Sequence, residues 1–196
     1  MDKQVIISIG REFGSGGHEI AQNLADRFGL PLYDYNLLRE IASEKNVNAT
    51  NLEQYDEVPK KGFSKTVRGF NNSPQLNIAY MQFDFLKKKA SEGESFVVVG
   101  RCSEEVLKGY EGLITIFVLG DMDKKIERIR RIHDMTEKEA TDLIEKQSKK
   151  RKAYHNYFCE TKWGDSRNYE LTINSSRLGM TNSVKMLINY IDMRRA

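Results

Sequence analysis

Three glycines within four positions give the sequence its clearest chemical signal. They belong to the stretch GREFGSGGH (residues 10–18), which follows a run of β-branched residues and precedes an amphipathic segment. Glycines allow consecutive backbone N–H groups to point toward one anion, and the first turn of a following helix adds positive potential at the same place. A simple strand-to-helix turn needs only one or two glycines. The stretch therefore predicts a phosphate-binding loop.

Two templates for such loops fit the stretch incompletely. In the template GxxxxGK[ST], aligning Gly16 with the last glycine leaves Gly17 at the lysine position and His18 at the hydroxyl position. The dinucleotide template GxGxxG is met at its first two glycines, but a glutamate stands where the third belongs. Asp34, about 20 residues further on, could serve as the carboxylate that binds a ribose. Both kinds of nucleotide loop stay open at this point.

Short hydrophobic runs alternate with helical patterns along most of the chain. The expected strands cover residues 4–9, 32–33, 96–99, 113–119 and 170–174. Apolar residues at helical spacing follow most of them, as in Ile20, Leu24 and Phe28 after the glycine loop. This alternation predicts an α/β fold in which helices cover both faces of a mostly parallel sheet. Ligands of such sheets bind beyond the carboxyl ends of the strands, so residues that follow strands are the candidates for chemistry.

Basic residues gather after two of the expected strands. Arg101 directly follows the strand at 96–99. A helix after the strand at 113–119 carries outward cations, Arg128, Arg130 and Arg131. Its inward face is expected to hold three isoleucines, Ile126, Ile129 and Ile132. A capping-box pattern at Thr136 and Glu139 predicts the start of the next helix, which runs into a basic stretch at 149–152. Any one of these cations fits a solvent-exposed face, whereas the cluster favours an anion site.

Several other residues have a simpler structural interpretation. His133 and His155 have no partner pattern in the sequence and are expected at the surface. Cys102 and Cys159 lack the spacing of metal ligands and are expected to be free structural thiols. The aromatic residues at 154, 157, 158 and 163 could stack on a base, but their spacing fits core packing better.

At this point the sequence resembles the cytidylate-kinase-like proteins, a branch of the P-loop nucleoside monophosphate kinases. Four segments in the same order carry the likeness: IISIGREFGSGGHEIA, PLYDYNLLREIA, VVVGRCSEEVL and the tract KKRKAYHNYF…KWGDSRNYELTINSS. The resemblance implies one three-layer P-loop kinase domain over residues 1–196, with a parallel central sheet. It also implies an acceptor-binding insertion of helix and loop over 45–92 and an arginine-rich lid over about 128–160. ATP and Mg²⁺ are the implied cofactors.

The resemblance also assigns roles to individual residues. It places the ATP phosphates against the glycine loop and the end of the lid, namely Gly14, Ser15, Gly16, Gly17, His18, Lys150 and Arg151. It places the acceptor against Asp34, Arg39 and Arg101. The cations around the transferred group would be Arg11, Arg101, Arg128 and Arg131. Arginine suits these roles because its planar fork meets two phosphate oxygens at once.

The chain departs from the family pattern at the loop lysine, which Gly17 replaces. Arg11 or His18 could supply the missing charge, and Arg11 is the better candidate because it stays protonated. Loss of the lysine could also leave nucleotide binding intact and end catalysis. Two functions therefore follow: a phosphotransferase that moves the γ-phosphoryl group of ATP to a nucleoside monophosphate such as CMP, or a non-catalytic nucleotide-binding protein. A dinucleotide-dependent oxidoreductase is the third alternative.

The bulk composition limits the classes of partner. A net charge of +3 is too small for a protein that binds a nucleic acid polymer through a basic stripe. No apolar stretch reaches the roughly 18 residues that a membrane span needs, and the first residues run directly into a strand without a signal-peptide pattern. We therefore expect a cytoplasmic protein that acts on a nucleotide or another small-molecule phosphate acceptor.

Overall fold

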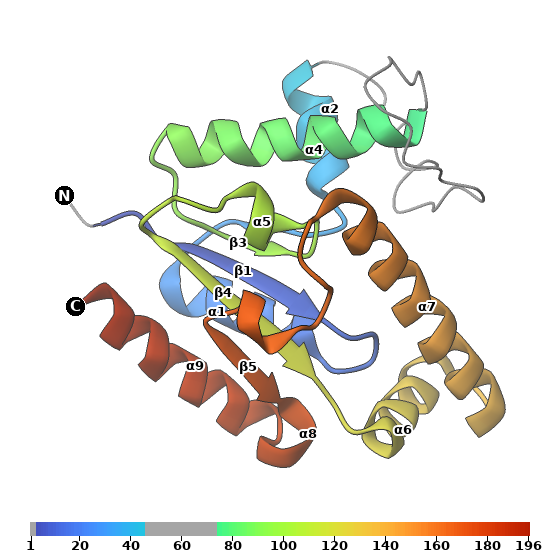
Figure 1. Ribbon diagram of the computed structural model, residues 1–196. Coiled ribbons are helices and arrows are strands. Elements are labelled where there is room, and N and C mark those ends of the chain that lie inside the picture. The colour runs from blue at the N-terminus through green and yellow to red at the C-terminus, as the bar shows by residue number, and fades with distance from the viewer. Residues whose placement is uncertain (1–2, 46–73) are drawn as a thin grey trace.

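The computed structural model describes residues 3–45 and 74–196, and in this part of the chain five parallel strands form one sheet (Figure 1). The strands are β1 (Ile6–Arg11), β2 (Leu32–Tyr33), β3 (Phe96–Val99), β4 (Leu113–Leu119) and β5 (Leu171–Asn174). Their order is β2-β3-β1-β4-β5. All five lie where the hydrophobic runs predicted strands, to within two residues at either end. Continuous burial on both faces explains why runs such as FVVV contain no polar alternation.

The strand order excludes the classical dinucleotide-binding arrangement that Asp34 had left open. In that fold the first two strands are neighbours in the sheet. Here β3 lies between β1 and β2, so the end of β2 is not next to β1, the strand that leads into the glycine loop. The alternative of a dinucleotide-dependent oxidoreductase is therefore wrong for this sheet.

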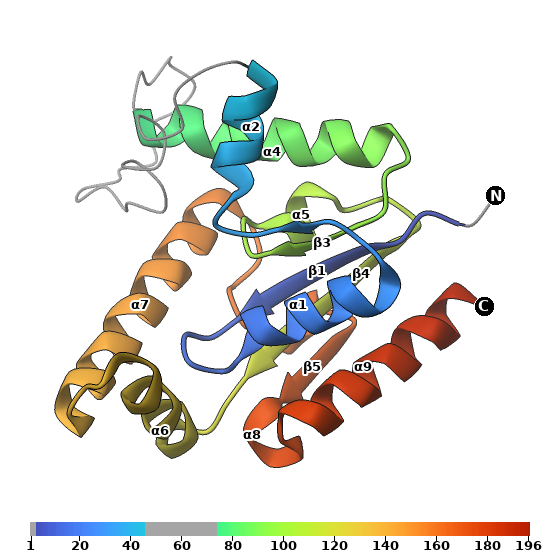
Figure 2. The same ribbon diagram turned by 180° about the vertical axis from the view of Figure 1, so that it is seen from behind.

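Helices cover both faces of the sheet, as Figures 1 and 2 show from opposite sides. The helices are α1 (Gly17–Phe28), α2 (Leu37–Lys45), α4 (Pro74–Ser91), α5 (Ser103–Val106), α6 (Met122–His133), α7 (Glu137–Phe158), the 3₁₀ turn η1 (Ser166–Asn168), α8 (Ser175–Leu178) and α9 (Met180–Arg195). Leu24 of α1 and Leu187 of α9 pack with Ile9 on one face. Leu38 of α2 and Leu86 of α4 pack with Val98 on the other. Among the described helices, none is both long and apolar enough to cross a membrane.

The pair α6 and α7 lies beyond the carboxyl end of the sheet (Figure 1). Ile129, Ala140 and Ile144 form a small core of their own between the two helices. The expected capping box begins α7, because the Thr136 side chain accepts from the Glu139 N–H and the Glu139 carboxylate accepts from the Thr136 N–H.

One expectation for α6 is wrong. The Ile132 side chain is 53% exposed rather than turned inward, because it lies outside the small core that Ile129 forms with α7.

The insertion expected over residues 45–92 is described only in part. Residues 46–73 lie outside the described residues, and 74–91 form α4, the helix predicted for that stretch. Phe85 and Leu86 of α4 pack on the sheet beside α2.

Candidate functional site

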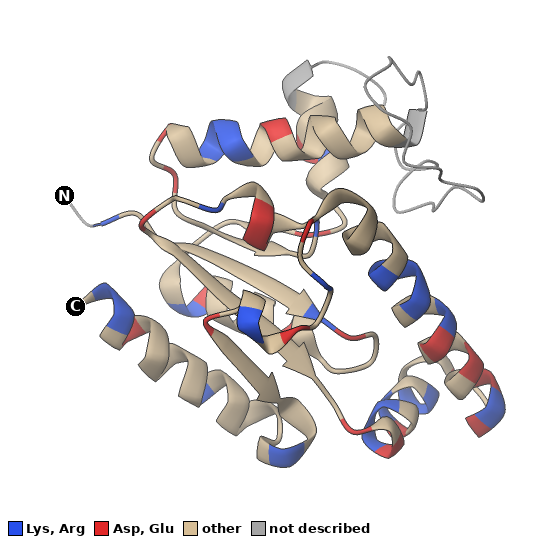
Figure 3. Ribbon diagram, in the orientation of Figure 1, with Lys and Arg blue, Asp and Glu red and all other residues tan. Residues whose placement is uncertain are grey.

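A groove of about 570 Å³ lies at the carboxyl ends of the strands and brings together most of the predicted site residues. Those that line it are Arg11, Gly14, Gly16, Gly17, His18, Asp34, Arg101, Arg128, Lys150 and Arg151. The register explains this convergence. The end of β1 pairs with the end of β4, and Gly100 follows β3 beside it, so three loops open at one edge. Figure 3 shows basic residues on α6 and α7 beside that edge.

The glycine loop has the conformation that its sequence predicted. Gly14 and Gly16 have φ values of 82° and 80°, in the left-handed region where a side chain is strained. Gly16 is the N-cap of α1, so the helix begins at the glycine loop. The first backbone N–H groups of α1 have no partner within the helix and are available to a ligand of the loop. Ser15 does not line the groove. Its hydroxyl donates to the Glu12 carbonyl at 3.0 Å, and its carbonyl accepts from the Ser175 hydroxyl at 2.6 Å, so Ser15 shapes the loop.

A second anchor of the loop was missed by the sequence analysis. The Glu12 carboxylate accepts from the Lys125 ammonium at 2.8 Å and from the Gly120 backbone N–H at 3.2 Å. The Lys125 side chain is only 9% exposed. A lysine four residues before Ile129, on the same inward face of α6, was the available signal. This ion pair ties the loop to the start of α6.

Arg11 occupies the space that a residue larger than glycine at position 17 would need. A Cβ built on Gly17 would lie 2.5 Å from the Arg11 Cβ and 3.1 Å from its Cγ. A Cβ built on Gly100 would overlap the Arg11 guanidinium. The Arg11 side chain therefore runs from the beginning of α1 to the end of β3, and Gly17, which meets its Cβ, is required to accommodate it. A lysine at position 17 and the present path of Arg11 exclude one another.

A test of this packing is the substitution Gly17→Ala. We expect it to lower the free energy of unfolding by about 1–3 kcal/mol, because the added methyl group meets a rigid Cβ rather than a flexible side-chain end. This loss should appear in urea denaturation although alanine has the higher helix propensity. In an Arg11→Gly background the same substitution should be neutral or stabilising. Unchanged stability of Gly17→Ala in the native background would contradict the proposed path of Arg11.

Arg101 lies on a strained turn. Gly100, Arg101 and Cys102 have φ values of 74°, 60° and 54°, so two consecutive residues with side chains are left-handed. Such a conformation costs on the order of 1–3 kcal/mol for each non-glycine residue and is typical of functional sites. The turn places Arg101 in the wall of the groove, with only 5% of its surface exposed.

Cations of α6 and α7 cover the groove from the other side. The Arg128 guanidinium forms an ion pair with Glu19 at 2.5 Å and lies beside Gly16. Arg151 donates to the Arg11 carbonyl at 3.5 Å, and its guanidinium lies 5.4 Å from the centre of the Phe13 ring. These contacts join both helices to the glycine loop.

Besides Ser15, two of the predicted residues lie outside the groove as the described residues define it. Arg131 is exposed on α6, because positions 128 and 132 face the groove and 131 is turned away from them. Arg39 is exposed on α2, whose neighbouring leucines face the core.

The Asp34 carboxylate has two contacts, one in the turn before α2 and one with His18 in the groove. One carboxylate oxygen accepts from the Asn36 N–H at 2.9 Å, which is the turn that leads into α2. The other lies 3.3 Å from His18 Nδ1. Asp34 therefore both fixes the turn before α2 and forms part of the groove wall.

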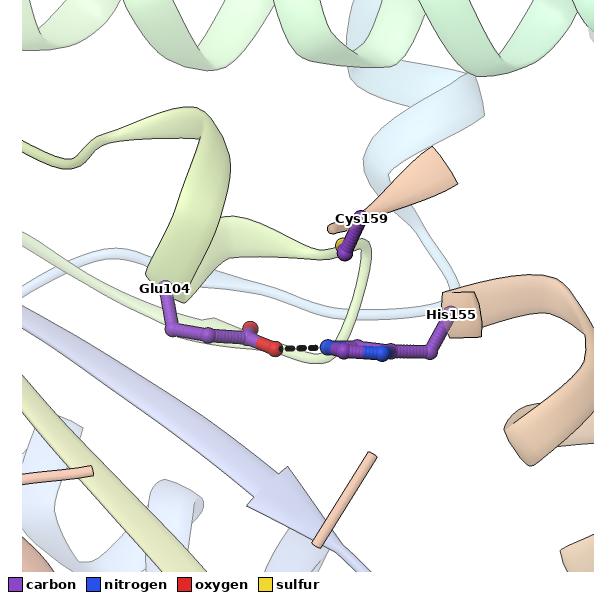
Figure 4. Close-up of side chains that lie close together, drawn as sticks. All are labelled: Glu104, His155 and Cys159. Atoms are coloured by element: carbon purple, nitrogen blue, oxygen red, sulfur yellow. Dashed lines mark hydrogen bonds and ion pairs between the residues drawn. The ribbon is translucent and has the colours of Figure 1, made fainter. Parts of the chain in front are cut away.

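Behind the groove lies a buried polar cluster that the sequence did not reveal (Figure 4). His155 Nε2 lies 2.6 Å from a Glu104 oxygen, and the Tyr169 hydroxyl donates to the same oxygen at 3.2 Å. His155 is 4% exposed, so its expected surface position is wrong. The last turn of α7 packs on α5 and turns His155 and Cys159, four residues apart, to the inside.

The protonation of this cluster follows from its contacts. Burial opposes the charge on His155, but hydrogen bonds to Cys159 and Glu104 outweigh burial and raise the pKa of His155 to about 10. A hydrogen bond with Cys102, together with His155, lowers the pKa of the Cys159 thiol to about 7 against the opposing effect of burial. Burial and the Glu104 charge raise the pKa of Tyr169. Both cysteines are free, as expected.

Comparison with known proteins identifies the fold. The model of the cytidylate kinase-like family matches residues 6–177. An uncharacterized protein from Eubacterium ventriosum ATCC 27560 is 40% identical, with a TM-score of 0.77, and the alignment covers 96% of this chain and 99% of that one.

More distant structures share the P-loop kinase fold. Shikimate kinase from Bacteroides thetaiotaomicron has 16% identity, a TM-score of 0.56, and coverage of 96% and 98%. A gluconokinase from Sinorhizobium meliloti 1021 has 13% identity, a TM-score of 0.55, and coverage of 98% and 93%. The search of curated proteins gave no match. The architecture described above is that of a P-loop kinase.

Proposed function

Because the chain belongs to the cytidylate kinase-like family, we propose that it transfers the γ-phosphoryl group of ATP to a nucleoside monophosphate such as CMP. The observation that carries this proposal is that a glycine loop and five cationic side chains of the described residues line one groove. Phosphoryl transfer requires mainly positioning and positive charge around the migrating group, and the groove supplies both.

The ATP phosphates would bind at the glycine loop. The loop and the first turn of α1 line the groove, and their N–H groups would donate to phosphate oxygens. Arg11 would supply the charge that a loop lysine gives in related kinases, from the end of β1 instead of from α1. Arg128, Lys150 and Arg151 on the other wall would act as the lid, over residues 128–160.

The acceptor would bind on the β2 and β3 side of the groove. Arg101 would hold its phosphate, with Asp34 in the same wall and Arg39 on α2 toward the insertion at 45–92. An oxygen of the acceptor phosphate then attacks the γ-phosphorus. The bond from that phosphorus to the β,γ-bridging oxygen breaks, and ADP leaves. No protein nucleophile is needed, because the acceptor itself attacks.

The carboxylates of the groove fit a magnesium ion. Mg²⁺ is usually held by one or two carboxylates together with phosphate oxygens and water. Glu19 and Asp34 line the groove and would hold it, once the ion takes the place of Arg128 at Glu19 and of His18 at Asp34. When bound, Mg²⁺ neutralises charge on the β- and γ-phosphates.

A non-catalytic nucleotide-binding protein is the second candidate function. The absence of a lysine at position 17 favours it. The buried Arg101 on its strained turn favours the kinase, because a protein that only binds ATP has no use for a costly arginine on the acceptor side.

A coupled ADP-release assay tests the choice. ATP–Mg²⁺ would be offered with CMP, dCMP, UMP and AMP, and with shikimate and gluconate as hydroxyl acceptors. We expect turnover on a monophosphate and a loss of about 10²–10³-fold in kcat/KM in Arg101→Ala. Arg130→Ala, an exposed position on α6 outside the groove, is the matched control and should behave as wild type. ATP binding without turnover on any acceptor would select the non-catalytic function.

A further inference from the structure

The buried cluster behind the groove is composed of metal-ligating side chains. Cys102 and Glu104 stand two residues apart at the start of α5. His155 and Cys159 stand four residues apart on and just after the last turn of α7. The spacing of four residues puts His155 and Cys159 on the same side of α7. Cys102 is the N-cap of α5 and has a left-handed backbone, so helical geometry does not relate its side chain to that of Glu104. All four residues are buried, with between 3% and 8% of their surface exposed.

Three of the four donors already lie close together. One ligand atom from each of Glu104, His155 and Cys159 lies within 4.8 Å of the others. Cys102 is not one of these three close donors, but it lines the same small cavity as Glu104 and His155, and its thiol would move toward them to become the fourth ligand. Figure 4 shows Glu104, from α5, and His155, from α7, pointing toward one another. Metal bonds of about 2.0–2.3 Å at tetrahedral angles keep ligand atoms roughly 3.3–3.8 Å apart, so closure of Glu104, His155 and Cys159 around an ion needs shifts on the order of one ångström.

The structure also provides space beside these donors. A small cavity of about 20 Å³ is lined by Cys102, Glu104 and His155, among others. One water-sized body needs about 10–15 Å³ by this measure, so the cavity has room for an ion. Arg11, Arg101 and Arg151 also line the cavity, and their positive charge opposes a dication there. The Glu104 carboxylate and two deprotonated thiols would supply the negative charge that offsets it.

Phosphoryl transfer makes no use of this cluster. Buried ionic groups bring little net stability compared with apolar residues of similar volume. Stability alone therefore does not explain why two thiols, an imidazole and a carboxylate occupy these buried positions. Two sulfurs with one nitrogen and one oxygen are, in contrast, a donor set that zinc prefers in four-coordinate sites. The spacing of the cysteines in the sequence did not reveal this group, because the fold brings Glu104 to His155 and Cys159 from about 50 residues away.

We propose that Cys102, Glu104, His155 and Cys159 form a binding site for a transition-metal dication of the zinc type. The ion would replace the direct hydrogen bond between His155 and Glu104 and release the protons of the imidazole and the thiols. It would join the turn that carries Arg101 to the helix that carries Lys150 and Arg151. The site would thereby fix the two walls of the groove relative to one another.

Cobalt titration of the full chain tests the site. The protein is freed of metal with a chelator, kept reduced, and shown by thiol titration to contain both free thiols and by circular dichroism to be folded. Co²⁺ should then give a thiolate-to-cobalt charge-transfer band and the visible bands of a tetrahedral ion, saturating at a single ion per chain, and Zn²⁺ should displace it. This readout does not depend on kinase activity.

Variants locate the ion. Cys159→Ser and Cys102→Ser should each weaken Zn²⁺ binding by more than about 100-fold in chelator competition, because even partners outside the coordination sphere contribute 10–100-fold. His133→Gln, an exposed histidine on α6, is the control and should bind as wild type. The proposal is overturned if the reduced, folded protein gives no thiolate band, or if either serine variant binds Zn²⁺ like wild type.

Discussion

Replacing Arg11 with alanine is expected to lower kcat/KM for phosphoryl transfer by about 10³-fold or more, the magnitude that a transition-state arginine contributes in such enzymes. The reason is that its side chain fills the space between Gly17 and Gly100, where the helix would otherwise carry a lysine. ATP affinity should fall less, by about 10–100-fold, since one charged contact contributes roughly 1.5–3 kcal/mol to binding. Steady-state kinetics and calorimetry measure the two effects separately.

A charge swap provides the matched control for Arg11. In the double variant Arg11→Gly/Gly17→Lys the cation starts from α1 rather than β1, and the Cβ of Arg11 that excludes a side chain at position 17 is gone. Part of the lost turnover should return in this variant. Gly17→Lys alone should not improve on wild type, because both side chains then compete for one space. If Arg11→Ala keeps wild-type turnover and ATP affinity, Arg11 is not the replacement for the lysine.

Glu104→Ala is expected to destabilise the metal-free protein by about 3–5 kcal/mol, because it leaves the charge of His155 buried without its partner. The pair has an oxygen–nitrogen distance of 2.6 Å, and the two side chains are 4% and 6% exposed. The Tyr169 hydroxyl would lose its acceptor as well. Urea denaturation at neutral pH measures the loss.

The neighbouring residue supplies the control for this substitution. Glu105→Ala removes the same side chain from a half-exposed position, where its ion pair with Lys108 is 3.7 Å long. That change should stay within about 1 kcal/mol, as for surface ion pairs. The double variant Glu104→Ala/His155→Ala should recover part of the loss by removing the unpaired charge. Equal effects of Glu104→Ala and Glu105→Ala would show that the buried pair carries no special energy.

Local patterns were sufficient to predict the framework. Strands such as 96–99 and 113–119 are buried on both faces, so each appears in the sequence as an uninterrupted apolar run. The glycine loop and the capping box at Thr136 depend on neighbouring residues alone, and both were predicted where the structure has them.

Features that depend on distant partners could not be predicted in the same way. The importance of Gly17 and Gly100 becomes clear only from the path of Arg11, which no spacing rule encodes. His155 was expected at the surface because its partner Glu104 lies 51 residues away on a helix of four residues. A helix of four residues is too short to show the helical periodicity from which its buried face could be predicted. Ile132 followed the helical period but lies beyond the contact that buries Ile129.

Calorimetric titration of the folded protein with ATP–Mg²⁺ tests the nucleotide groove most directly. It should show a single ATP bound per chain, with weaker binding in Arg11→Ala and Arg128→Ala and unchanged binding in Arg130→Ala. Arg11 and Arg128 line the groove on opposite walls, whereas Arg130 lies outside it. No binding of ATP at millimolar concentration, with the protein folded, would contradict the assignment of the groove to a nucleoside triphosphate.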